Sequence, residues 1–135
     1  MKRVVLDTSV VVAASISPTG PNGQVIELIR RGLVKPYATT VLFEEYTRVF
    51  GHSHLAHLNR TRIANLLRLL RRTATFVNPA GKLRISGHDA DNHVYECAAA
   101  AYSHFIVTEN LRHFPAGHKY TKIVTARQLL RLLKD

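Results

Sequence analysis

The chain has 135 residues, is 46% hydrophobic, and carries 19 Lys and Arg against nine Asp and Glu, which gives a formal net charge of +10. This length and composition predict one soluble globular domain over residues 1–135. No run reaches the roughly 20 apolar residues of a membrane span, the apolar run after Met1 is too short for a signal peptide, and the single Cys97 excludes an intrachain disulfide. We therefore expect a cytoplasmic protein with an anionic partner, and nucleic acid fits best.

The predicted elements alternate between strands and helices. In chain order the pattern predicts a strand over residues 3–6, helices over 10–16 and 24–31, a strand over 34–38, helices over 41–50 and 60–72, a strand over 73–77, a helix over 91–102, strands over 104–107 and 122–124, and a helix over 126–133. The predicted N-caps include Ser9, Thr39 or Thr40, and Thr125, and Asp91 stands where another is expected.

Short apolar strands separated by helices favour a parallel sheet with helices on both faces, so we predict the α/β class. In such sheets, ligands bind outside the carboxyl ends of the strands. Four side chains with amide or carboxylate oxygens either follow a predicted strand or lie on the helix after one: Asp7, Glu45, Asp91 and Asn110. We expect these four residues to converge on one pocket, although they lie far apart in the sequence.

Carboxylates gathered at strand ends suit a divalent cation, because Mg²⁺ takes oxygen ligands and keeps several waters. Asp7 and Asp91 are the expected direct ligands, and Glu45 is either a ligand or a group that orients a metal-bound water. The hydroxyl side chains that could position water or phosphate oxygens are Thr8, Ser9 and Thr108. A metal site in so basic a protein suggests phosphodiester chemistry on nucleic acid. Each acid alone could also be a simple helix cap.

Four segments resemble, in order, the four motifs of PIN domains. They begin with Leu6-Asp7-Thr8-Ser9, Leu42-Phe43-Glu44-Glu45, Asp89-Ala90-Asp91-Asn92 and Phe105-Ile106-Val107-Thr108. One such motif is weak, but four in order over residues 3 to about 125 are specific. The chain is similar to the VapC-like toxin ribonucleases of toxin–antitoxin pairs.

The resemblance implies a three-layer α/β/α PIN-like fold with a central parallel sheet of four to five strands. It also implies RNA cleavage dependent on Mg²⁺ or Mn²⁺, an acidic cognate antitoxin, and a homodimer. Asp7, Glu45 and Asp91 match three of the four acidic positions, and the fourth, often Asp, is Asn110 here. Asn keeps an oxygen and loses a charge, which weakens metal affinity and favours one-metal chemistry. The nearby acids that could compensate are Asp89 and Glu96.

Two other doubly wound classes are disfavoured. A haloacid-dehalogenase-type phosphatase needs a second Asp where this chain has Ser9. A receiver domain needs an acidic pair before the Asp of the first strand and a Lys at the end of the last strand, and this chain has neither. The chain also lacks Gly-x-Gly-x-x-Gly and a phosphate loop. A binding module without catalysis stays open, because Asn110 departs from the acidic pattern.

Several further residues have two readings. His52, His54 and His57 share one connector but have no Cys nearby, so a surface loop is favoured over a zinc site. His113, beside the fourth motif, either contacts a phosphate or packs in a loop. The basic residues that could guide RNA are Arg68, Arg71, Arg72, Arg112 and Lys119. The leucines that could close the core or form a dimer surface are Leu129, Leu130, Leu132 and Leu133.

Overall fold

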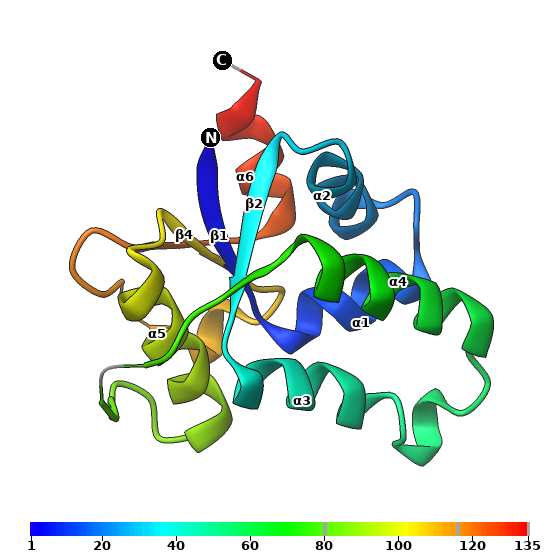
Figure 1. The fold of residues 1–135 in the computed structure, drawn as a ribbon, viewed down its shortest axis with the longest axis horizontal. Coiled ribbons are helices and arrows are strands. Elements are labelled where there is room, and N and C mark those ends of the chain that lie inside the picture. The colour runs from blue at the N-terminus through cyan, green and yellow to red at the C-terminus, as the bar shows by residue number, and fades with distance from the viewer. Residues whose placement is uncertain (80, 116, 135) are drawn as a thin grey trace.

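The computed structural model describes residues 1–79, 81–115 and 117–134 (Figure 1). Its five-stranded sheet has the order β3-β2-β1-β4-β5, and every pairing between neighbours is parallel. The strands are β1 (Lys2–Leu6), β2 (Val34–Ala38), β3 (Thr75–Phe76), β4 (Phe105–Val107) and β5 (Lys122–Val124). Register pairs Val5 of β1 with Tyr37 of β2 and with Ile106 of β4.

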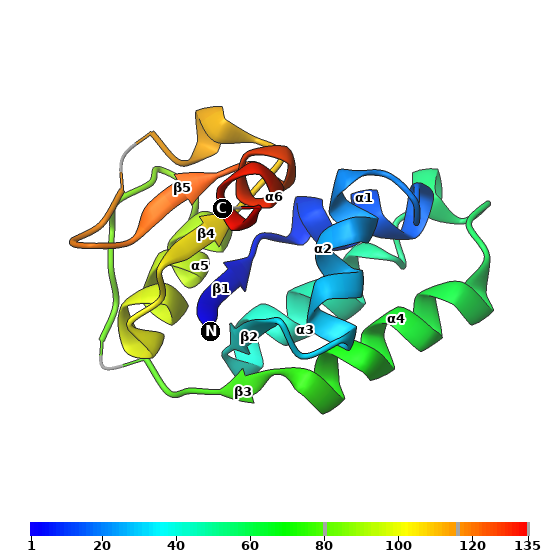
Figure 2. The same ribbon diagram turned by 90° about the horizontal axis from the view of Figure 1, so that it is seen from above.

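Helices cover both faces of this sheet. They are α1 (Thr8–Ile16), α2 (Pro21–Arg30), α3 (Thr40–Val49), α4 (Arg60–Thr73), α5 (Asp89–Ala101) and α6 (Ala126–Leu133), with 3₁₀ turns η1 (Ser53–Leu55) and η2 (Leu111–His113). Seen from above, α5 lies on one face, and α2 and α6 lie on the other (Figure 2). The predicted three-layer α/β/α fold and the predicted order of elements are therefore confirmed.

The interior strands β1 and β4 show why the sheet forms the core. A strand covered by helices on both faces needs apolar side chains on both sides, which gives a continuous run instead of an alternating one. Val4, Val5 and Leu6 of β1 and Ile106 and Val107 of β4 are all at most 1% exposed. This apolar core holds the polar strand ends in fixed positions.

The helix α4 shows the expected division of faces. Ile63, Leu66 and Leu70 are buried, and Leu67 packs against the core from its edge. The helix begins where Asn59 Oδ1 accepts a hydrogen bond from the backbone N–H of Arg62 at 3.0 Å. Its arginines lie on the exposed side of the helix.

Three helices begin two or three residues earlier than predicted. The first helix begins at Thr8, with Asp7 instead of Ser9 at the N-cap, because the Ser9 hydroxyl donates to the Asp7 carboxylate. The second begins at Pro21, since proline suits the first helical position. The fifth begins at Asp89, which moves Asp91 from the predicted N-cap into the first turn.

The strand predicted over residues 73–77 is also shorter, because α4 continues through Thr73 and leaves β3 with two residues. In α6, Leu129 is fully buried while Leu132 is 54% exposed, so this helix closes the core with most of its leucines. Within the described residues, no helix has the length and apolarity needed to cross a membrane.

Candidate active site

The candidate site lies at the carboxyl edge of the sheet. Asp7 directly follows β1, and Asn110 lies three residues beyond the end of β4. Glu45 is on the second turn of α3, and Asp91 is in the first turn of α5. Because parallel strands present their carboxyl ends at one edge, these elements bring together residues from the whole length of the chain.

Asp7 is buried and held by two hydroxyl groups. Its Oδ2 accepts hydrogen bonds from Ser9 Oγ at 2.6 Å and from Thr108 Oγ1 at 2.9 Å. Asp7 is only 9% exposed. Its backbone N–H donates to Val107 O at 2.9 Å, which continues the ladder between β1 and β4. Both hydroxyl bonds go to the same carboxylate oxygen, Oδ2.

The same hydroxyls hold the chain that leaves β4. The backbone N–H of Glu109 donates to Ser9 Oγ, and that of Asn110 donates to Thr108 Oγ1, each at 3.0 Å. The hydroxyl network therefore ties Asn110 to the strand end that carries Asp7. Asn110 itself is exposed and opens the short helix η2.

Glu45 points into the site, while its neighbour Glu44 is exposed. The Glu45 side chain is 14% exposed, and its Oε1 lies 2.6 Å from His93 Nδ1 on α5. Burial raises the pKa of Glu45, the charge of Asp7 raises it further, and His93 and Arg48 oppose the rise. The raised pKa follows from a carboxylate that is desolvated near a second negative charge.

Asp91 has a similar environment. It is 7% exposed, its Oδ2 accepts a hydrogen bond from Ser86 Oγ at 3.3 Å, and His113 Nδ1 lies 3.8 Å from the same oxygen. Burial raises the pKa of Asp91, the charge of Asp7 adds to the rise, and His113 and Ser86 oppose it. Asp7 thus interacts electrostatically with both other acids, which makes one coupled carboxylate cluster of Asp7, Glu45 and Asp91.

The chemistry of this cluster fits a hydrated divalent cation. Among the described residues, no three His, Cys, Asp or Glu side chains form a group that could hold a metal ion. A closed site with three or more such ligands, typical of zinc, therefore does not fit these residues. Mg²⁺ binds through one or two carboxylates plus waters and phosphate oxygens, and a cation would relieve the repulsion that raises the two pKa values.

A family model for the PIN domain matches residues 3–112. The chain belongs to the PIN domain family. PIN domains are generally nucleases, so membership of this family supports assigning the protein to the hydrolases. No curated protein matches the chain.

In this PIN domain, sequence reasoning missed the residues that position the acids. His93 contacts Glu45 from 48 residues away, and Tyr46 donates its hydroxyl to Leu6 O at 2.5 Å, next to Asp7. Asn92 Oδ1 accepts from the backbone N–H groups of Ile85 at 3.0 Å and Ser86 at 2.7 Å. The contacts of His93 and Tyr46 join distant segments, and those of Asn92 join a helix to the irregular connector before it, so the helix and strand patterns of the sequence did not reveal them.

Some predicted residues do not reach the cluster. Glu96 lies elsewhere on α5, where its Oε2 accepts a hydrogen bond from the backbone N–H of Leu83 at 2.8 Å. The support of the acids by Glu96 therefore stays a prediction, because in the structure its carboxylate faces the connector before α5, about 140° around the helix axis from Asp91. Asp89 is exposed in the first turn of α5, and Thr8 is half-buried at the start of α1.

The predicted basic residues lie in separate places. Arg71 stacks over the Phe43 ring at 4.7 Å, and Arg68 donates to Asn65 Oδ1 at 2.9 Å. Arg112 belongs to η2 beside the acids, whereas Lys119 lies in the loop before β5. Of these basic residues, Arg112 is the one that lies on η2, directly after Asn110.

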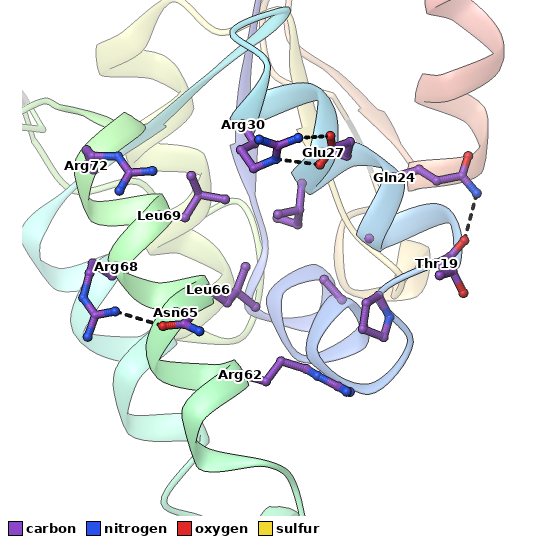
Figure 3. A pocket seen from close by; sticks show the side chains of 14 residues that line it. Thr19, Gln24, Glu27, Arg30, Arg62, Asn65, Leu66, Arg68, Leu69 and Arg72 are labelled. Atoms are coloured by element: carbon purple, nitrogen blue, oxygen red, sulfur yellow. Dashed lines mark hydrogen bonds and ion pairs between the residues drawn. The ribbon is translucent and has the colours of Figure 1, made fainter.

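A cavity of about 780 Å³ lies between α2 and α4 and does not contain the carboxylate cluster (Figure 3). Leu66 and Leu69 point from α4 into this groove, and Arg68 and Arg72 lie along its edge. Across from them, Arg30 of α2 is paired with Glu27. We call this feature the α2–α4 groove: it has an apolar floor and a rim rich in arginine.

Proposed function

We propose that this PIN domain is a metal-dependent endoribonuclease that hydrolyses RNA phosphodiester bonds. The observation that carries the proposal is the coupled carboxylate cluster at the sheet edge, in a chain of net charge +10. A cluster of acids in a basic protein suits a cation that binds together with a polyanion. Mg²⁺ or Mn²⁺ would be held by Asp7 with Asp91, and it would offset charge on the phosphate.

The chain's own residues would then hold the metal ligand in place and accept a proton from the attacking water. Ser9 and Thr108 fix the Asp7 carboxylate, so its position costs little reorganisation during the reaction. Glu45 has a raised pKa, which suits a group that accepts a proton from the attacking water. His93 Nδ1 lies 2.6 Å from Glu45 Oε1 and can hold that carboxylate in place.

Cleavage of end-labelled structured RNA tests the proposal. Purified protein is assayed with Mg²⁺, with Mn²⁺ and with EDTA, beside Asp7→Asn and the control Asp89→Asn. We expect cuts that need the metal, vanish in Asp7→Asn and persist in Asp89→Asn, because Asp89 is an exposed acid outside the cluster. Equal cleavage by Asp7→Asn would refute the assigned role of Asp7.

A binding module with weak or no catalysis is the second candidate, and Asn110 favours it. The position lacks a negative charge, which lowers the expected affinity for a cation. Retained RNA binding without cleavage, at any metal tested, would favour this second candidate. Restored cleavage in Asn110→Asp would then identify the missing charge as the cause.

We further propose that the nuclease is the toxin of a toxin–antitoxin pair with an acidic antitoxin. The α2–α4 groove supports this role, because leucines on its floor and arginines on its rim complement an acidic amphipathic segment. Induced expression in a bacterial host should arrest growth, and Asp7→Asn should not. Equal arrest by both proteins would separate growth inhibition from the carboxylate cluster and refute the toxin assignment.

A further inference from the structure

A second feature lies at the opposite end of α5 from the acids. Among the described residues, Tyr102 and Lys119 are the two non-glycine residues with positive φ, at 51° and 55°. Both line the same pocket of about 430 Å³, beside Tyr120 and Lys82. Side chains other than glycine are disfavoured in this backbone region, and such positions cluster at functional sites.

Tyr102 occupies a position where glycine is the usual residue. The backbone N–H of Tyr102 donates to Ala99 O at 3.3 Å, and that of Ser103 donates to Ala98 O at 3.0 Å. This pair of bonds is the Schellman ending of a helix, whose left-handed residue is most often glycine because it has no Cβ. A bulky tyrosine there strains the backbone, and no burial compensates, since Tyr102 is 66% exposed.

The two tyrosines form a parallel aromatic pair. The rings of Tyr102 and Tyr120 are 6.2 Å apart between centroids and inclined by 8°. Tyr120 is 52% exposed, so both rings present surface to solvent. Exposed, nearly parallel rings offer a flat surface on which a nucleobase can stack.

Cations surround this aromatic pair. Lys82 and Lys119 line the pocket with Tyr102, and Arg3 Nη1 donates to Tyr102 O at 3.4 Å. The acid in the pocket wall, Glu96, is occupied by its hydrogen bond from Leu83. Positive charge beside an exposed aromatic surface is the combination that binds single-stranded nucleic acid.

We infer that Tyr102, Tyr120, Lys82 and Lys119 form a second RNA-binding site, where a single-stranded base stacks on the tyrosines and the lysines contact phosphates. The inference rests on the proposed function in taking RNA as the ligand. Tyr102 lies 11 residues after Asp91, or about 16 Å along α5 by a rise of about 1.5 Å per residue. A few nucleotides of one strand can therefore connect this tyrosine–lysine site to the carboxylate cluster.

The variant Tyr102→Gly separates binding from folding. Glycine removes the ring and relaxes the left-handed backbone, so the melting temperature should stay equal or rise. The probe is a fluorescein-labelled single-stranded RNA of about 12 nucleotides, measured by anisotropy in EDTA so that no cleavage occurs. We expect Tyr102→Gly and Tyr120→Ala each to weaken binding about tenfold, which lies within the roughly 5- to 150-fold range for the loss of one stacked base.

Charge variants form the matched comparison. Lys82→Gln should weaken binding and reduce its salt dependence, because one phosphate contact is lost. Arg127→Gln removes the same charge from an exposed position on α6 and should leave affinity within twofold. If Lys82→Gln and Arg127→Gln lose RNA affinity equally, net charge alone explains the loss, and the proposed site is overturned.

Other outcomes are also decisive. Unchanged RNA affinity in Tyr102→Gly and Tyr120→Ala overturns the site, even if RNA cleavage persists and the proposed nuclease stands. Loss of affinity in both variants supports it, even if no metal gives cleavage and the proposed nuclease fails. If the two variants instead change the sedimentation of the free protein and leave RNA affinity intact, the tyrosines form a contact between copies of the chain.

Discussion

Thr108 donates its hydroxyl to Asp7 Oδ2 over 2.9 Å, although 101 residues separate the two in the sequence. The bond exists because β1 and β4 are neighbours in the sheet and end at the same edge. The hydroxyl of Ser9 donates to the same Asp7 oxygen from the first turn of α1. The orientation of the central acid is therefore set by two hydroxyls from distant parts of the chain.

Replacing the hydroxyl of Thr108 should lower activity without unfolding the protein. Thr108→Val keeps the shape of the side chain and removes both its bond to Asp7 and its bond from the Asn110 N–H. Groups that orient a metal ligand typically affect activity or metal affinity by about 10–100-fold when they are lost. The measurement is the rate of RNA cleavage against Mg²⁺ concentration. Thr73→Val, which removes a hydroxyl bond inside α4, is the control and should retain full activity.

Removing the charge of Asp91 should stabilise the fold. Burial and the charge of Asp7 raise its pKa above 3.8, the value expected in the unfolded chain. An ionised group with a raised pKa costs stability at any pH above its folded pKa, and this cost disappears below the unfolded value. Asp91→Asn should therefore melt a few degrees higher at pH 7, and the difference should shrink as the pH falls below about 4.

Asp89→Asn is the matched control, because it removes the same charge from the same helical turn at an exposed position. It should not raise the melting temperature, since a negative charge near a helix N-terminus is favourable. A melting temperature for Asp91→Asn at or below that of the wild type at pH 7 would contradict the repulsion between Asp7 and Asp91.

Restoring an acid at residue 110 tests the fourth motif. Asn110→Asp adds a carboxylate on the segment that Thr108 ties to Asp7. We therefore expect equal or higher activity, with half-maximal activity at a lower Mg²⁺ concentration. Cleavage rates over a Mg²⁺ titration measure both effects. A folded but inactive Asn110→Asp protein would show that the amide itself has a task, such as donating a hydrogen bond to RNA.

Close packing makes Gly23 intolerant of any side chain. A Cβ at this position would lie 1.9 Å from Pro18 O, which is well inside contact distance. Gly23→Ala should destabilise the protein by about 3 kcal/mol through overpacking, because a backbone atom cannot move aside as a side chain can. Urea unfolding measures the change. Gly87→Ala is the control, since nothing lies within 4 Å of its added Cβ, and it should unfold close to the wild-type midpoint.

Cys97 should be inert in the folded protein. It is fully buried, and burial raises the pKa of its thiol to about 12. At pH 8 roughly one thiol in ten thousand would be the reactive thiolate, even before access is considered. Iodoacetamide should therefore leave the native protein unmodified in mass spectrometry and add one group in guanidinium chloride. Rapid modification under native conditions would show that α5 opens.

Local pattern sufficed for the order of elements, because each signal lies within a few neighbouring residues. The apolar run before Asp7 predicted β1, and the leucine stripe of α4 predicted its buried face. Boundaries were less accurate: a cap depends on which way a side chain turns, and Ser9 turned toward Asp7 instead of capping α1. The partner His93 was missed because its contact with Glu45 spans 48 residues, and Ser86 was missed because its contact with Asp91 depends on how the irregular connector before α5 folds back.

The fold class, the net charge and the candidate acids can all be predicted from the amino-acid sequence. They can be predicted because apolar periodicity and strand-end positions are local properties of the chain. Three features required the folded structure: how these acids are held, how Glu96 faces the connector before α5, and how Tyr102 and Lys119 line one pocket. These features depend on distances between residues far apart along the chain, which packing of the sheet and helices alone fixes.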